Sequence, residues 1–204
     1  MDYIITTNEL GTWLKEENIE LNELEDSNFD ELTGTGAGYI FGCSGGVTES
    51  ALRTAYYLIT GNIAPSDFFD LKQVRGIEGM KYADVKIGDK NLKLAVVSTT
   101  ANARKLLKQI EEENVKYDFV EVMACPSGCI SGAGQPKTTT PITNEIRQKR
   151  MDGLYNYDSK CKTKSSFENE QIIAIYKEFL NNPLSEKSIN LIHTSYINKE
   201  NILN

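Results

Sequence analysis

The chain contains 204 residues, of which 40% are hydrophobic and 25% are charged, a composition typical of globular domains. Its 29 acidic and 22 basic side chains leave a net charge of -7, which argues against a nucleic-acid-binding protein because phosphate binding needs clustered lysine and arginine. No apolar run approaches the roughly 20 residues of a membrane helix, and the N-terminus is too acidic for a signal peptide. We therefore expect a soluble, cytoplasmic protein that binds neither nucleic acid nor membrane.

Histidine and cysteine are scarce, and this narrows the possible chemistry. A hydrolase triad or a two-histidine metal site would depend on His193, the single histidine, which we interpret as a packing residue. The four cysteines are Cys43, Cys125, Cys129 and Cys161. Because there is no secretion signal, the close pair Cys125 and Cys129 indicates a reduced metal or redox site rather than a disulfide.

The first third of the chain predicts two helices separated by irregular segments. A short strand at residues 2–7 is followed by a helix that Asn8 caps and that runs to about Glu17. An acidic connector and a glycine-rich segment, 33–38, lead to a strand-like stretch at 39–41. The glycines lack the spacing of a dinucleotide-binding fingerprint, and we expect no helix to start among them. The second helix runs from Val47 to about Thr60 and ends at Gly61.

The middle of the chain predicts a βαβ unit. Residues 92–98 and 118–123 have the composition of buried strands, and residues 102–113 that of the helix between them. Such a unit implies a parallel pair of strands with a right-handed crossover. The second strand runs directly into the loop that contains Cys125 and Cys129. Because open parallel sheets bind ligands at the carboxyl ends of their strands, this position favours a functional role for the loop.

The composition changes near residue 142, where we place a boundary between an α/β body, residues 1–142, and a helical tail, residues 143–204. The tail begins with a basic stretch, 144–164, which we interpret as a solvated face or a surface that docks against the acidic body. A helix is expected from Asn169 to about Leu180, and a last short one at 185–192 after Pro183.

The segment 121–136 contains the strongest chemical signal. Cys125 and Cys129 stand four residues apart, among several glycines and directly after a strand. Thiolates are soft ligands for iron-sulfur, zinc or cuprous centres, and glycines let the backbone approach a cluster and aim amide groups at it. A glycine-rich turn with two thiols that bind nothing is the alternative, since a four-iron cluster usually takes four cysteines.

This segment resembles the third signature of the iron-only (diiron) hydrogenases, Glu-x-Met-x-Cys-x-x-Gly-Cys-x-x-Gly-Gly-Gly-Gln-Pro. Residues 39–55 are similar to the family segment Phe-Gly-x-x-Gly-Gly-Val-x-Glu-Ala-Ala-Leu-Arg-Thr. Stretches at 74–79 and 102–107 also match the family, and the tail resembles its small-subunit region. The resemblance implies an α/β fold, one lobe of a two-lobed parallel-sheet catalytic domain, followed by a helical C-terminal tail.

The resemblance also implies a metal centre and a reaction. The family's 4Fe–4S cube is joined to a diiron subsite, which reversibly reduces protons to dihydrogen with ferredoxin as the usual electron partner. By position, Cys125 and Cys129 would ligate the cube, and Cys129 would also bridge to the diiron unit. Phe41 and Met123 would line the apolar diiron pocket.

Parts of the family pattern are missing or altered. The two upstream signatures, Thr-Ser-Cys-Cys-Pro-x-Trp and Met-Pro-Cys-x-x-Lys-x-x-Glu, do not occur in these residues, so only two of the four cube ligands are present. Ser131 and Ala133 replace two signature glycines, a change that would cost about 1 kcal/mol if those positions need a positive φ. Cys43 stands where small residues are common, and we interpret it as packing.

Two functions remain open. The first is the C-terminal half of an iron-only hydrogenase, inactive until an upstream hydrogenase half or subunit joins it. The second is a non-catalytic iron-sulfur-binding relative that serves cluster assembly or sensing, or a decaying remnant. Retention of the pocket residues together with both ligands favours the first function, whereas the altered glycines and the missing ligands favour the second.

Overall fold

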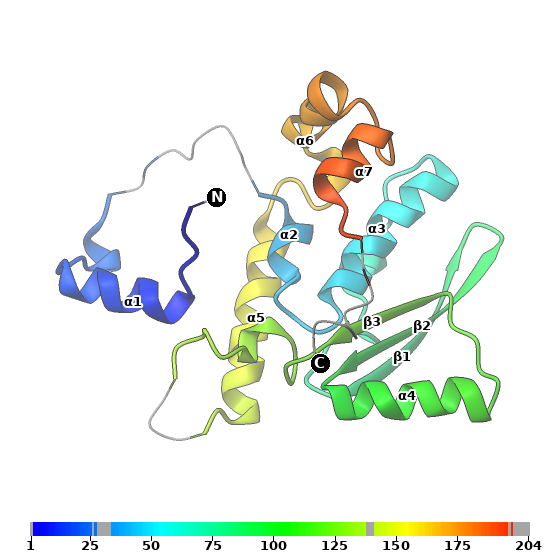
Figure 1. Ribbon diagram of the computed structural model, residues 1–204, viewed down its shortest axis with the longest axis horizontal. Coiled ribbons are helices and arrows are strands. Elements are labelled where there is room, and N and C mark those ends of the chain that lie inside the picture. The colour runs from blue at the N-terminus through cyan, green and yellow to red at the C-terminus, as the bar shows by residue number, and fades with distance from the viewer. Residues whose placement is uncertain (1, 26, 28–33, 138–140, 196, 198–204) are drawn as a thin grey trace.

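Helices pack around a small sheet in this protein, and the computed structural model describes residues 2–25, 27, 34–137, 141–195 and 197 (Figure 1). The sheet contains β1 (Met80–Ile87), β2 (Lys90–Ser98) and β3 (Phe119–Met123), in that order. The α-helices are α1 (Thr7–Glu16), α2 (Gly36–Ile40), α3 (Gly46–Thr60), α4 (Thr100–Glu112), α5 (Asn144–Lys160), α6 (Glu170–Ile175) and α7 (Glu186–Ile192). The short 3-10 helices are η1 (Leu21–Glu23), η2 (Ser66–Phe69), η3 (Cys129–Ser131) and η4 (Ser166–Glu168), and η5 (Tyr176–Leu180) is a π-helical segment that follows α6. The predicted α/β class is therefore confirmed.

The predicted βαβ unit is present, within a mixed sheet. β2 and β3 are parallel and α4 connects them, as the sequence predicts. β1 pairs with β2 in the antiparallel direction and was not predicted. Its signal lies in the alternation of Ala83, Val85 and Ile87, all buried, followed by a two-residue turn whose first residue, Gly88, has a φ of +58°. A glycine with positive φ in that position is typical of a type II′ hairpin turn.

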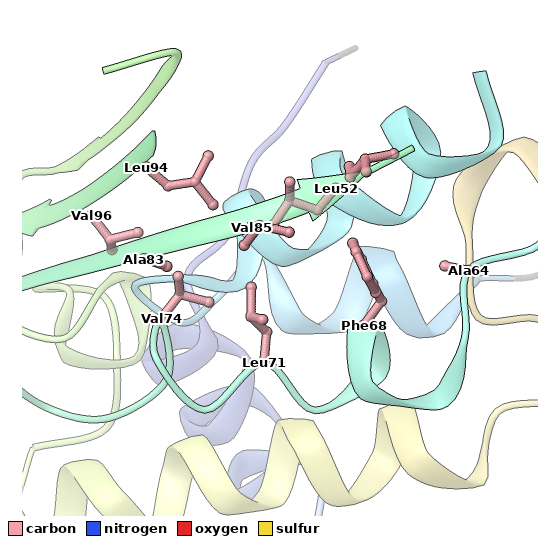
Figure 2. Packing of buried hydrophobic residues seen from close by; sticks show 10 residues of the cluster. Leu52, Ala64, Phe68, Leu71, Val74, Ala83, Val85, Leu94 and Val96 are labelled. Atoms are coloured by element: carbon pink, nitrogen blue, oxygen red, sulfur yellow. The ribbon is translucent and has the colours of Figure 1, made fainter. Parts of the chain in front are cut away.

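The core lies on both faces of the sheet. On one face, Leu52 of α3 and Phe68 of η2 pack against Val85 and Val96 of the strands (Figure 2). On the other face, Leu106 of α4 packs with residues of β2. Burial of these side chains is the main force that holds α3 and α4 to the sheet.

Two predicted strands near the N-terminus are wrong. Residues 2–6 form no strand, and α1 begins at Thr7 because Thr6, rather than Asn8, caps it. The Thr6 hydroxyl accepts a hydrogen bond from the Glu9 amide at 3.2 Å, and the Glu9 carboxylate accepts one from the Thr6 amide at 2.7 Å. This Thr-x-x-Glu capping box is a helix signal in the sequence that outweighs the β-propensity of the preceding residues.

The stretch 39–41 is also helical, since α2 starts at Gly36, inside the glycine-rich segment. Thr35 caps this short helix by accepting a hydrogen bond from the Gly38 amide at 3.3 Å. The Gly36 amide donates to the carbonyl oxygen of Thr163 at 2.9 Å. A contact with the tail, 127 residues away in the sequence, thus helps to select helix where local composition favours strand.

The third correction concerns β3, which was predicted to be buried. It is an edge strand, and Phe119, Val120 and Val122 are 37%, 36% and 57% exposed, whereas Glu121 is buried. The described residues of this chain therefore leave apolar side chains of β3 open to solvent.

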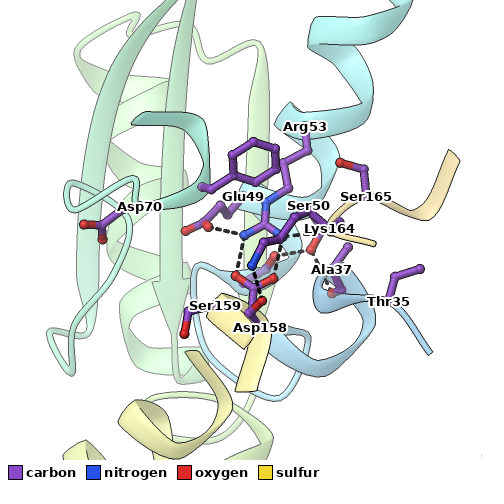
Figure 3. A network of polar contacts seen from close by, with 12 residues as sticks. Thr35, Ala37, Glu49, Ser50, Arg53, Asp70, Asp158, Ser159, Lys164 and Ser165 are labelled. Atoms are coloured by element: carbon purple, nitrogen blue, oxygen red, sulfur yellow. Dashed lines mark hydrogen bonds and ion pairs between the residues drawn. The ribbon is translucent and has the colours of Figure 1, made fainter. Parts of the chain in front are cut away.

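The tail docks against the body through α5, a helix that the sequence analysis treated only as a basic stretch. Arg53 of α3 is fully buried and donates to both carboxylate oxygens of Asp158 on α5, at 2.9 and 2.8 Å (Figure 3). It also donates to Glu49 at 2.6 Å, and Arg75 binds the same Glu49 carboxylate. This buried network of alternating charges joins tail and body. The two predicted terminal helices are present as α6 with η5 and as α7.

Candidate metal centre

The residues between the two close cysteines form a tight turn after β3. The Gly128 amide donates to the carbonyl oxygen of Cys125 at 3.1 Å, and Ser127 has a φ of +61°. Pro126 in the second position and a positive φ in the third are features of a type II turn. Cys129 then begins η3. Cys125 and Cys129 therefore flank one turn, which we call the cysteine turn (residues 125–129).

Backbone hydrogen bonds fasten the cysteine turn to the loop that follows α2. The Ser44 amide donates to the carbonyl oxygen of Ser127 at 3.0 Å, and the Ile130 amide donates to that of Gly42 at 3.1 Å. Gly128 lies between these bonds with a φ of +98°, and a Cβ there would come within 2.6 Å of the Ser44 nitrogen. Only glycine allows the two backbones to approach this closely.

The strand ends support the cysteine turn from the other side. Ser98 and Met123, the last residues of the parallel strands, are paired in register. The Ser98 hydroxyl accepts a hydrogen bond from the Ser127 amide at 3.3 Å, and the Thr99 amide donates to the carbonyl oxygen of Met123 at 2.8 Å. The turn thus lies at the carboxyl edge of the parallel pair, where the sequence predicted a ligand-binding loop.

The structure brings the four predicted site residues to this edge. Phe41 directly precedes the loop that binds the cysteine turn, and Met123 lies two residues before Cys125, the first residue of the turn. Phe41 is 47% exposed and Cys129 is exposed, whereas Met123 and Cys125 are partly buried. All four side chains are therefore at least partly exposed to solvent in this chain.

Glu121 connects the strand to the neighbouring helix. Its buried carboxylate accepts hydrogen bonds from the Gly45 amide at 2.6 Å and from the amide and hydroxyl of Thr48, both at 2.8 Å. It therefore satisfies amide groups at the N-terminus of α3, where a negative charge is favourable. Glu121 is thus a carboxylate that orients the loop before α3.

Lys81 is a buried charge that sequence reasoning missed. Its ammonium group donates to the carbonyl oxygens of Ser44 at 2.8 Å and Gly76 at 2.9 Å. Burial lowers the pKa of Lys81 to about 8, although the nearby carboxylates of Glu121 and Glu78 act in the opposite direction. The available signal was the position of Lys81, which alternates with exposed residues in the same way as Ala83, Val85 and Ile87. This signal could be used only once β1 itself was predicted.

The other two cysteines and the histidine have surroundings that differ from those of Cys125 and Cys129. Cys43 is fully buried with Ile130 and Met151, and burial raises the pKa of its thiol to about 12. This environment disfavours the thiolate that a metal needs and agrees with a packing role. Cys161 is partly buried after α5, and burial also raises its pKa. His193 is exposed after α7, so its interpretation as a packing residue is wrong.

Aligned with the signature, only Ala133 replaces a glycine, because Ser131 falls at an unspecified position, and neither residue causes backbone strain. Neither Ser131 nor Ala133 has a positive φ, so the conformational cost considered from the sequence does not arise. Within the part of the chain that the structure describes, the buried Ser131 hydroxyl has no hydrogen-bond partner.

The donor set is suited to part of a cluster site. The described residues contain no group of three or more histidine, cysteine or acidic side chains that could hold a metal ion. They do contain two free thiols that flank one turn, of which Cys129 is exposed and Cys125 is partly buried. Two soft ligands in a glycine-rich turn fit an iron-sulfur cluster whose other ligands come from elsewhere.

Comparison with known proteins identifies the family. Residues 1–133 match the family model of the iron-only hydrogenase large subunit, C-terminal domain, and residues 144–199 match that of the iron hydrogenase small subunit. The chain belongs to the iron-only hydrogenase family. The resemblance found in the sequence is therefore confirmed.

Individual relatives agree with this assignment. The chain is 43% identical over 204 residues to the NADP-reducing hydrogenase subunit HndD of Solidesulfovibrio fructosivorans, covering 99% of this chain and 34% of that protein. It superposes on an apo form of the FeFe-hydrogenase HydA1 from Chlamydomonas reinhardtii with a TM-score of 0.74 and 37% identity, covering 97% of this chain and 55% of that one. This hydrogenase-family chain thus spans about a third of the curated relative and about half of the solved one.

The family also includes proteins named for another task. The chain is 29% identical over 201 residues to the cytosolic Fe-S cluster assembly factor narfl of Xenopus tropicalis, covering 96% of this chain and 41% of that protein. Family membership alone therefore leaves catalytic activity open. None of the helices in the described ranges is long and apolar enough to cross a membrane.

Proposed function

We propose that this chain supplies one half of the active site of an iron-only hydrogenase that reversibly reduces protons to dihydrogen. The observation that carries the proposal is the cysteine turn, in which Cys125 and Cys129 flank a turn bonded to the loop after Phe41. Such a turn offers two thiols and an apolar neighbour on one sheet edge. The thiols can ligate an iron-sulfur cluster, and the apolar neighbour can exclude water from it.

In this proposal Cys125 and Cys129 would hold a 4Fe–4S cube, and Cys129 would also help to hold a diiron subsite. The cluster would supply the electron transfer and proton reduction, as cofactors do in redox enzymes. The chain's residues would hold and shield it. Phe41 and Met123 would keep water from the diiron side, and Gly128 would let the backbone of the loop approach.

Two further cube ligands must come from residues outside these 204. A second part of the hydrogenase, in the same polypeptide or a separate one, would provide them and would cover the exposed side of Phe41 and Cys129. A ferredoxin-type carrier is the electron partner we propose. We retain the division into residues 1–142, the lobe that carries the site, and 143–204, the tail that docks on it.

Cluster assembly or sensing without hydrogen chemistry is the second candidate function. The relatives named as Fe-S assembly factors favour it, because they match nearly the whole chain. Iron binding at the two thiols, without hydrogen evolution, would distinguish this function from the first.

The first prediction tests the ligands. Co-expression of this chain with the complementary part of a hydrogenase large subunit and the maturation proteins should give a complex that evolves dihydrogen and contains iron. Cys129→Ala should abolish hydrogen evolution and lower the iron content, because it removes a cube ligand and the bridge to the diiron unit. Gas chromatography and iron analysis provide the two measurements.

Cys161→Ala is the matched control, because this partly buried cysteine lies after α5 and outside the cysteine turn. Its activity and iron content should equal those of the wild type. Hydrogen evolution that survives Cys129→Ala would refute the ligand assignment, and iron retention without any activity in the wild-type complex would favour the assembly or sensing function.

A further inference from the structure

Lys81 and Glu121 lie in one row across the sheet. Val96 of β2 is the register partner of Lys81 in β1 and of Glu121 in β3. Both charged residues are buried, at 6% and 5% exposure. Because neighbouring strands are about 4.8 Å apart, the backbones of the two residues are roughly 10 Å apart. Their side chains form no direct ion pair, and each binds a third group.

That group is the peptide bond between Ser44 and Gly45. The Lys81 ammonium donates to the carbonyl oxygen of Ser44 at 2.8 Å, and the amide of Gly45 donates to the Glu121 carboxylate at 2.6 Å. The two atoms belong to one planar peptide group and point in opposite directions in its trans form. One peptide is thus held between a cation and an anion.

This arrangement accounts for two buried charges that form no direct ion pair. Among the described residues, Lys81 has no carboxylate within salt-bridge distance, and buried charges are costly unless they are compensated. The ammonium polarises the carbonyl and the carboxylate polarises the amide, so each charge strengthens the other's hydrogen bond.

The clamped peptide belongs to the loop that binds the cysteine turn, since the Ser44 amide donates to the carbonyl oxygen of Ser127. We propose that Lys81 and Glu121 are positioning residues that jointly clamp the 44–45 peptide and thereby set the cysteine turn against the loop after Phe41. The clamp itself is a property of the apo chain, and only its purpose in metal binding rests on the proposed function.

Titration of Lys81 distinguishes the clamp from a role in packing alone, because only the clamp makes the hydrogen bond of the Gly45 amide depend on the charge of Lys81. The charged or titratable groups that face its ammonium are Glu121 on β3, Glu78 in the segment before β1, and Cys43 in the clamped loop. The pKa of about 8 means that the ammonium loses its charge near pH 8. The carbonyl of the clamped peptide then loses its charged donor, and the bond from the Gly45 amide to Glu121 weakens.

The second prediction concerns the Gly45 amide, observed by NMR in the ¹⁵N-labelled 204-residue chain without iron. Its proton resonance should lie far downfield and should move upfield as the pH rises from about 6 to about 10, with a midpoint near the pKa of Lys81. Lys81→Met should remove this pH step, and Lys81→Arg should keep the downfield position without the step. Glu121→Gln should shift the resonance upfield at every pH.

Lys86→Met is the control, because Lys86 is exposed on the same strand. It should leave the Gly45 titration unchanged. Hydrogen exchange of the Ser44 amide should become about tenfold faster in Lys81→Met, as expected when a charge-assisted hydrogen bond that orders the loop is lost. A Gly45 resonance in the wild type that does not respond to pH, or one that responds equally in Lys81→Met, would overturn the clamp. The experiment contains no iron, so its outcome is independent of the hydrogenase test.

Discussion

At the scale of single residues, the candidate site depends on close approach between backbones. Gly128 lies where the cysteine turn meets the loop at 42–44, and its surroundings are backbone atoms that cannot rotate away. Sequence inspection identifies Gly128 as part of a glycine-rich signature. The structure adds that it is the one position in the turn where a side chain would collide with Ser44 and Gly42.

The third prediction follows from this contact. Gly128→Ala should lower the free energy of unfolding by about 3 kcal/mol, because it adds backbone strain at positive φ to a collision with fixed atoms. Gly61→Ala serves as the control: Gly61 also has a positive φ, of +71°, but open space around it. Its cost should be about 1 kcal/mol. Urea unfolding of both variants gives the comparison, and equal losses would show that the collision contributes nothing.

At the scale of elements, the docking of α5 combines a buried ion network with an apolar cluster, in which Met151 of α5 packs with Cys43 and Ile130. Arg53, Glu49 and Asp158 are all nearly inaccessible to solvent, and Arg53 also donates to the carbonyl oxygen of Lys164 at 2.9 Å. Arg150 of the same helix donates to the carbonyl oxygens of Ile130 and Pro136 at 2.7 and 2.6 Å, so α5 also supports the segment after the cysteine turn. The stretch therefore includes a docking surface, one of the two interpretations of the sequence, but its ion pair has the opposite sense to the one expected, since Asp158 of the tail binds Arg53 of the body.

The fourth prediction tests this network. Asp158→Ala should destabilise the chain by about 4 kcal/mol, since it leaves the Arg53 charge buried without its bidentate partner. Asp152→Ala, at an exposed position of the same helix, should change stability by less than about 0.5 kcal/mol. Denaturant unfolding measures both, and limited proteolysis should cut the tail of Asp158→Ala faster. A loss no larger than that of Asp152→Ala would contradict the proposed docking role.

At the scale of the whole molecule, the chain has an incompletely covered sheet. β3 is an edge strand with three partly exposed apolar side chains, and exposed apolar edges are prone to association. The chain covers about half of a solved relative's length, and under the proposed function the second part of the hydrogenase would cover this surface. In its absence, a second copy of the chain can take the same place.

The fifth prediction concerns this association. The 204-residue chain should self-associate at micromolar concentration, and Val122→Lys should shift it toward monomer because a charge at the strand edge opposes pairing. Leu191→Lys is a matched control, since Leu191 on α7 is 56% exposed and Val122 is 57% exposed. Sedimentation velocity resolves the species. Identical distributions for wild type and Val122→Lys would exclude the β3 edge as the contact.

The local sequence determined the features whose causes are themselves local. The helices α3 and α4, the parallel strands, the cysteine pair and the family follow from caps, periodicity and motif spacing, which involve residues close together in the chain. The choice of Cys125, Cys129, Phe41 and Met123 as site residues also came from the motif. Their metal-binding roles remain predictions.

Only the tertiary structure decided the features that depend on distant partners. α2 is a helix because Thr35 caps it and the tail binds its first amides, and β3 is exposed because no described strand lies beyond it. Lys81 and Glu121 have a shared role only because two strand registers align them on either side of one peptide. Sequence patterns report which residues prefer to be buried or capped, whereas contacts between remote segments decide which of those preferences are met.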